Sequence, residues 1–241
     1  MIFSVRHLLT MAILPIVLLL MYIYQKDKRQ PEPMGQLIKA FCFGVLSVPL
    51  SFTMSIPFET IGLYSDSSTT VLGNIATAFF GAAIPEEIAK FVMLWLVLRH
   101  NKYFDERMDG MVYAAFVSMG FAGVENVLYL FNNYDDYMSV AISRGLFAVP
   151  GHFCFAILMG YYYSLVKFSP SPSCKHKVLV LLAPILAHGI YDAILFVTSI
   201  TSTLLSLILI VAFLVFCTRM WKYANKRIDE HLRNDMEEGR V

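Results

Sequence analysis

The chain has 241 residues, of which 57% are hydrophobic and only 15% are charged, and its formal net charge is +1. In an average soluble domain about a quarter of the residues are charged, so this composition excludes an ordinary soluble domain. The near-zero net charge and the lack of a long basic block argue against a nucleic-acid partner, because phosphate binding needs clustered lysine and arginine. The cysteines have no paired spacing, which excludes a disulfide scaffold.

Apolar stretches recur along the whole chain. Since one membrane-crossing helix needs about 20 mostly apolar residues, the sequence predicts about seven crossings, at residues 8–24, 37–57, 70–98, 110–131, 139–166, 178–198 and 201–218. The first stretch has a long apolar core without a small-residue cleavage site, so we expect it to be retained. The expected fold is all-α, a polytopic transmembrane helix bundle that forms one membrane-embedded domain over residues 1–218.

Two of the predicted crossings are irregular. The stretch 70–98 has 29 residues, and as one straight helix it would be about 44 Å long, beyond the roughly 30 Å hydrocarbon core of a bilayer. We expect it to be broken or tilted, with Gly81 and Pro85 as the breakpoints. The stretch 139–166 contains Pro150 and Gly151, so we expect it to bend or to begin as a short interfacial segment.

The distribution of lysine and arginine predicts the orientation. The connections 25–39, 99–109 and 167–177 and the tail 219–241 carry these residues, whereas the alternate connections 59–69, 132–137 and 199–202 carry none. By the positive-inside rule, the N-terminus is expected outside and the C-terminus in the cytoplasm. We therefore expect an integral protein of the cell membrane, embedded in the lipid bilayer, with residues 219–241 as a solvated charged tail.

Ionisable side chains also fall inside the apolar stretches. The candidate site residues are Glu86, Glu87, Lys90, Glu125, His152, His188 and Asp192. A charge near the bilayer centre costs a few kcal/mol even on the lenient insertion scale, so such residues indicate a functional site. Counting about 1.5 Å per residue from each cytoplasmic boundary, four stretches place such a side chain roughly 20–22 Å from that face. This common depth predicts one polar layer, whereas Arg144, nearer the outer end, is expected to be an interfacial anchor.

Local spacing indicates what this layer can do. Glu86 and Glu87 share a helix face with Lys90, and His188 shares one with Asp192, because residues three or four apart are neighbours on a helix. One of the two adjacent carboxylates can then act as a general base that activates water for amide hydrolysis. The developing oxyanion needs a donor, which one of the two histidines of the layer can supply.

Other chemistries use the same residues. His152 and His188, with Glu125 or Asp192, have the composition of a zinc shell with an open water position. No HExxH motif is present, and carboxylate catalysis without a cofactor is the preferred interpretation. A proton-coupled transporter would use the acids as a relay, and a membrane scaffold would use the layer only to fix helix packing.

The motifs also resemble those of a known family. Residues 85–90, Pro-Glu-Glu-Ile-Ala-Lys, resemble the EExxK motif of the PrsW family of intramembrane proteases. Residues 108–113 and 120–126 resemble its DGxxYG and FxxxEN segments, residues 144–153 its third motif, and residues 188–192 its final HxxxD. The resemblance covers about residues 80–196 with the order preserved, and the family is similar to the group of CAAX prenyl endopeptidases and bacteriocin-processing proteins.

This resemblance implies an endopeptidase of a bacterial membrane that cleaves a membrane-anchored protein substrate, for which the family's precedent is an anti-sigma factor. By analogy with the related proteins, Glu86 activates water with help from Glu125, while His188 and Asp192 stabilise the oxyanion. Glu125 stands where those relatives have histidine, and Asp192 where many have asparagine, so the assignment of base and donor stays open. Family members are also described as metalloproteases, which leaves the zinc alternative open as well.

Overall fold

The computed structural model describes residues 2–171 and 173–240, and every regular element within these two ranges is helical. The expected all-α fold is therefore confirmed. The α-helices are α1 (Ile2–Lys26), α2 (Met34–Thr60), α3 (Val71–Ala76), α4 (Ile84–Leu98), α5 (Arg107–Asn132), α6 (Tyr137–Ser143), α7 (Val149–Phe168), α8 (Cys174–Ile200) and α9 (Thr203–Glu237). The remaining elements are the π-helical segments η1 (Thr77–Ala83) and η3 (Arg144–Ala148) and the 3-10 turn η2 (Tyr134–Asp136).

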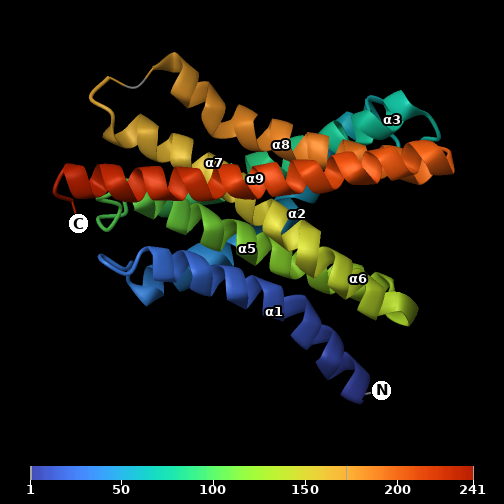
Figure 1. Cartoon of the computed structure of the whole chain (residues 1–241), viewed down its shortest axis with the longest axis horizontal. Helices are drawn as coiled ribbons and strands as arrows, with labels where there is room; N and C mark the ends of the chain where they lie inside the picture. The colour runs from blue at the N-terminus through green and yellow to red at the C-terminus, as the bar shows by residue number, and fades with distance from the viewer. Residues whose placement is uncertain (1, 172, 241) are drawn as a thin grey trace.

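Helical stretches long enough to cross a membrane make up most of the bundle. Within the described ranges there are 6, at Val5–Lys26, Met34–Thr60, Arg107–Asn132, Tyr134–Phe168, Cys174–Ile200 and Thr203–Glu237. The predicted crossing at 70–98 is instead divided among α3, η1 and α4, which follow one another without a loop. Figure 1 places the two termini at opposite ends of the bundle, as an odd number of crossings requires. Which end faces the cytoplasm stays a prediction.

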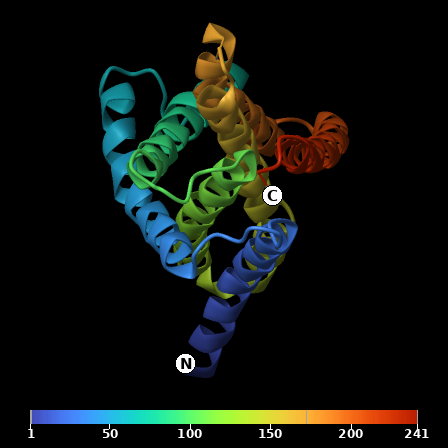
Figure 2. The same ribbon diagram turned by 90° about the vertical axis from the view of Figure 1, so that its left-hand side faces the viewer.

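Helix α5 forms the centre of the bundle. Almost every residue from Arg107 to Ala122 is buried, and α1, α2, α7 and α9 pack around it, as the end-on view in Figure 2 shows. Glycines allow these close approaches: a methyl group at Gly44 of α2 would overlap the backbone carbonyl of Val117, and one at Gly160 of α7 would overlap that of Gly110. Small residues thus set how closely α2 and α7 approach α5.

The two irregular crossings contain the two π-helical segments. Segment η1 ends at Ala83, and Pro85 follows in the first turn of α4; segment η3 ends at Ala148, and Pro150 follows in the first turn of α7. Proline lacks a backbone N–H, so it is tolerated where a helical turn is already widened or restarted. The irregularities predicted near Gly81–Pro85 and Pro150–Gly151 are confirmed. Each lies directly before a candidate site residue, which is where π-helical turns are often found.

The C-terminal segment differs from the expected solvated tail. Residues 219–237 continue α9 without a break, and His231 and Asp235 on its inner face are fully buried. The two carboxylate oxygens of Asp235 accept the backbone N–H groups of Arg107 and Met108, each at 3.0 Å. The first N–H groups of a helix have no partner within the helix, so this side chain caps α5 from another helix. Only the outer face of the segment is solvated.

Candidate active site

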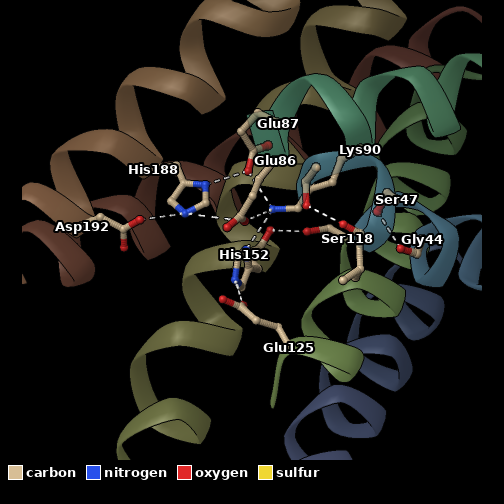
Figure 3. A network of polar contacts seen from close by, with 12 residues as sticks. Gly44, Ser47, Glu86, Glu87, Lys90, Ser118, Glu125, His152, His188 and Asp192 are labelled. Carbon is tan, nitrogen blue, oxygen red and sulfur yellow. Dashed lines mark hydrogen bonds and ion pairs between the residues drawn. The ribbon is translucent and has the colours of Figure 1, made fainter. Parts of the chain in front are cut away.

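A cavity of about 320 Å³ lies between α4, α5, α7 and α8, and ionisable side chains form part of its wall. Its lining includes five of the predicted site residues, namely Glu86, Glu125, His152, His188 and Asp192. Aromatic side chains, among them Phe147, Phe155, Tyr191 and Phe213, also line the cavity. Glu87 and Lys90 lie behind this wall, each 1% exposed, and Figure 3 shows all seven residues in one network of polar contacts.

Lys90 is the centre of this network. Its Nζ lies 2.9 Å from Oε1 of Glu87, 3.2 Å from Oε2 of Glu86 and 3.1 Å from Nδ1 of His152. The same ammonium lies 4.1 Å from the centroid of the Phe121 ring. An ammonium has three donors, and these contacts use all of them, which is what a buried charge requires. Lys90 therefore fixes two glutamates of α4 and connects α4 to α7.

The two adjacent glutamates occupy different environments. Oε1 of Glu87 lies 2.9 Å from Lys90 Nζ and 2.9 Å from Nδ1 of His188, and its side chain is 1% exposed. The side chain of Glu86 is 14% exposed and faces the cavity, with Lys90 at 3.2 Å and Nε2 of His188 at 3.9 Å. Glu87 is thus committed to two charged neighbours, whereas Glu86 has open space beside its carboxylate.

The ring of His188 is held from both sides. Nδ1 contacts Glu87 at 2.9 Å, and Nε2 lies 3.2 Å from Oδ2 of Asp192, one helical turn away. The ring also stacks on Phe155, with centroids 4.8 Å apart and an interplanar angle of 16°. A ring with protons on both nitrogens donates to both carboxylates, so this geometry suits a fixed donor at the cavity wall.

His152 is positioned by an ion pair that the sequence did not reveal. Its Nε2 lies 2.8 Å from Oε2 of Glu125, and the guanidinium of Arg144 lies 2.8 Å from the same oxygen. Nε of Arg144 also donates to Oδ1 of Asn126 at 2.7 Å. The expectation that Arg144 is an interfacial anchor is therefore wrong, because its side chain is only 12% exposed and lines the cavity. The sequence does place Glu125 and Asn126 in another crossing without a basic residue nearby, and this could have predicted Arg144 as their partner.

The zinc alternative can be tested against these donors. Glu86, His152 and His188 each offer one ligand atom, and these atoms lie within 4.8 Å of one another. The carboxylate of this set is Glu86, whereas the sequence suggested Glu125 or Asp192. Glu125 contacts His152 and Glu87 contacts His188, in the way that carboxylates hold the histidine ligands of many zinc sites.

The composition of this set matches a zinc shell of two histidines and one glutamate. However, the ammonium of Lys90 already lies beside two of the three donors, at 3.1 Å and 3.2 Å. A zinc ion bound by all three would meet this buried positive charge, so the donors as arranged do not fit zinc together with a charged Lys90.

Comparison with known proteins identifies the family. A family model described as "PrsW family intramembrane metalloprotease" matches residues 32–218, which contain every candidate site residue. The chain belongs to the PrsW family. It is 35% identical over 188 residues to Protease PrsW of Geobacillus kaustophilus (78% of this chain and 79% of the relative) and 38% identical over 190 residues to that of Oceanobacillus iheyensis (78% and 82%). Protease PrsW of Clostridioides difficile is 32% identical over 233 residues, covering 94% of this chain and 92% of the relative. No solved structure matches the chain significantly.

PrsW membership confirms the resemblance seen in the motifs. The protein is a peptidase and an integral membrane protein of bacteria, in keeping with its long apolar helices. Membership of a protease family indicates a protein substrate, and the long apolar helices indicate a lipid bilayer environment. This outcome favours the peptidase over the transporter and scaffold alternatives that the same acids suggested.

Proposed function

We propose that this PrsW protein cleaves a peptide bond of a membrane-anchored protein and that Glu86 activates the attacking water. The single observation that carries this proposal is the contrast within the glutamate pair. Glu86 faces a cavity of about 320 Å³, whereas Glu87 is buried and engaged by Lys90 and His188. A general base needs space for a water at hydrogen-bond distance, and only Glu86 of the two has it.

The proposed reaction is acid–base hydrolysis of an amide. Glu86 removes a proton from water while the water oxygen forms a bond to the carbonyl carbon. The C–N bond then breaks, and the proton held by Glu86 passes to the leaving amine, which returns the carboxylate to its starting form. Lys90, in contact with Glu86 at 3.2 Å, offsets the negative charge of the carboxylate in a region with little water.

The developing oxyanion needs a preorganised donor. His188 suits this role because its Nε2 lies at the cavity wall between Asp192 and Glu86, at 3.2 Å and 3.9 Å. Glu87 and Asp192 act as positioning residues, because they hold the ring without contacting the reacting atoms. His152, held by Glu125 and Lys90, forms the neighbouring part of the wall.

The test uses the full chain purified in detergent and a panel of single-span membrane peptides. Glu86→Gln keeps the shape of the side chain but removes the base, so kcat should fall by about 10²–10⁴-fold. The control is Glu59→Gln, because Glu59 is exposed at the end of α2 and should leave cleavage unchanged. Near-normal cleavage by Glu86→Gln, with the protein folded, would contradict the proposal. A membrane-anchored anti-sigma factor is the substrate that the resemblance suggests, and it belongs in the panel.

A second candidate is a zinc-dependent protease with Glu86, His152 and His188 as ligands. The clustering of these donors within 4.8 Å favours it, and it requires Lys90 to lose its charge or to move away from Glu86 and His152. Metal content and chelator sensitivity, measured on the protein preparation used for cleavage, separate the two. Cleavage that persists in chelator without stoichiometric zinc supports the carboxylate mechanism, whereas activity that tracks bound zinc supports the metal mechanism.

A further inference from the structure

A second group of acidic side chains lies at the end of the bundle that carries the C-terminus. Asp27 directly follows α1, Glu106 directly precedes α5, and Asp109 lies in the first turn of α5. Figure 2 views the bundle from this end, where the α1–α2 and α4–α5 connections run close to the start of α5. Asp109 and Glu125 are separated by 16 residues of one helix, or about 24 Å, so this group is distinct from the catalytic cavity.

These three carboxylates are buried, and no side-chain cation pairs with them in the described part of the chain. Asp27 is 2% exposed, Glu106 is 1% exposed and Asp109 is 0% exposed. Oδ2 of Asp27 and Oδ1 of Asp109 are buried and accept no hydrogen bond, while the Glu106 side chain faces only the backbone N–H of Asp109 in a capping box. None of the ion pairs found among residues 2–171 and 173–240 includes any of the three. Buried charged groups are normally paired or bound to a metal, so these oxygens point to a missing positive partner.

The nearby cations are engaged elsewhere. The ammonium of Lys167 donates to the backbone carbonyl of Phe104, and the guanidinium of Arg107 contacts Glu238 at 2.6 Å and 2.7 Å. A further buried acid, Glu32, accepts the hydroxyl of Tyr113 and adds negative charge beside Asp109. Neither of these two cations forms an ion pair with Asp27, Glu106 or Asp109.

We propose that Asp27, Glu106 and Asp109 bind one hard divalent cation of the magnesium or calcium class. One carboxylate oxygen from each residue lies within 4.8 Å of the other two. An ion with oxygen ligands at about 2.4 Å, as for calcium, can bridge two oxygens up to about 4.8 Å apart, whereas magnesium, at about 2.1 Å, needs them within about 4.2 Å. The donor set contains only carboxylates, which suits hard cations and not zinc or copper, since those prefer nitrogen and sulfur ligands.

The position of the site gives the ion a structural role. Oδ2 of Asp109 accepts the backbone N–H groups of Asp105 and Glu106 at 2.9 Å and 2.8 Å, which folds the α4–α5 connection over the start of α5. Asp27 brings the end of α1 to the same point. The cation therefore joins α1 to the α4–α5 connection and to the central helix, and it stabilises the bundle without taking part in peptide hydrolysis.

The test measures binding of Mn²⁺ to the full chain in detergent after metal removal, from the electron paramagnetic resonance signal of free Mn²⁺, with Mg²⁺ and Ca²⁺ as competitors. Wild type should bind one Mn²⁺ per chain outside the catalytic cavity, so a His188→Ala protein should bind it equally. Asp27→Asn and Glu106→Gln, which preserve side-chain size, should weaken binding at least tenfold. Asp105→Asn is the control, because Asp105 is exposed and adjacent to the site but is not a proposed ligand. The competitor that displaces Mn²⁺ at the lower concentration identifies the preferred ion.

Thermal unfolding provides a second readout that does not depend on the variants being active. Mg²⁺ or Ca²⁺ should raise the unfolding temperature of wild type and of Asp105→Asn but not that of Glu106→Gln, with choline chloride as the ionic-strength control. If Asp27→Asn or Glu106→Gln does not fold, the stoichiometry and the thermal shift of the wild type still decide. Two results would overturn the proposal: wild type that binds no stoichiometric Mn²⁺, or Asp27→Asn and Glu106→Gln proteins that bind Mn²⁺ as tightly as wild type. Carboxyl groups held together by shared protons would give these results, because they do not need Mg²⁺ or Ca²⁺.

Discussion

Arg144 gives the sharpest test of the site geometry outside the proposed base. Its guanidinium makes a charge-assisted hydrogen bond to Glu125 at 2.8 Å and a hydrogen bond to Asn126 at 2.7 Å, and it lies 4.0 Å from the centroid of the Tyr129 ring. A hydrogen bond that involves a charged group contributes about 1.5–3 kcal/mol, and both of these bonds have the guanidinium as donor. Because the side chain is 12% exposed, we expect Arg144→Met to lower the free energy of unfolding by about 2–3 kcal/mol.

The same substitution should reduce cleavage. Without Arg144, Glu125 loses the guanidinium that balances its charge and keeps the hydrogen bond to His152, whose ring is then less firmly oriented. Misplacement of a group by about 1 Å can cost up to roughly 10²-fold in rate, so we expect a loss of about 10–100-fold in kcat.

Unfolding in mixed detergent micelles and peptide cleavage are the two assays. Arg219→Met is the matched control, because Arg219 is exposed on α9, and its unfolding free energy should stay within about 0.5 kcal/mol of wild type. If Arg144→Met behaved like this control in both assays, the ion pair with Glu125 would have no role.

Three further predictions concern packing and capping. Gly44→Ala should lower the free energy of unfolding in micelles by about 1–3 kcal/mol, because the added methyl overlaps a backbone carbonyl of α5. Gly35→Ala is the control and should be neutral or stabilising, because there is open space around Gly35. Equal effects of the two substitutions would contradict the packing argument. Asp235→Ala should lower the free energy of unfolding by about 0.5–2 kcal/mol in the same assay, because two backbone N–H groups lose their acceptor. Amide hydrogen exchange at the start of α5 should also become faster, and unchanged exchange would show that the cap is not needed. Phe121→Leu should lower the free energy of unfolding by about 2 kcal/mol, because the ring centroid lies 4.1 Å from the buried ammonium of Lys90. If the loss were no greater than that of a Phe-to-Leu change elsewhere in the core, the ring would make no cation–π contribution.

Much of the fold and of the site follows from the sequence for physical reasons. Apolar runs of about 20 residues have few alternatives to membrane helices, and charges inside them are costly enough to mark a site. Pro85 and Pro150 lie in the first turn after the π-helical segments, whereas Pro15, Pro49, Pro57 and Pro184 lie inside continuous helices, so a proline alone does not predict a break. The grouping of Glu86, Glu125, His152 and Asp192 at one depth needs only the constant rise of a helix.

What the sequence did not predict depends on contacts between helices. Adjacent residues such as Glu86 and Glu87 point about 100° apart on a helix, but which of them faces the cavity depends on neighbouring helices. Arg144 was misassigned because its partners lie on α5, and the inner face of residues 219–237 was missed because Asp235 caps a helix that is distant in sequence. The acids of the α1–α2 and α4–α5 connections are expected to be solvated from the sequence, but in the structure Asp27 and Glu106 are buried.

The most direct test of the central claim compares two isosteric substitutions in one motif. Single-turnover cleavage of a membrane peptide should fall by at least about 100-fold in Glu86→Gln, whereas Glu87→Gln should lose much less, because its amide oxygen can still accept from Lys90 and His188. Both variants should unfold cooperatively, which separates loss of the base from loss of the fold. A larger loss in Glu87→Gln, or cleavage by Glu86→Gln within a few-fold of wild type, would contradict the assignment of Glu86 as the residue that activates water.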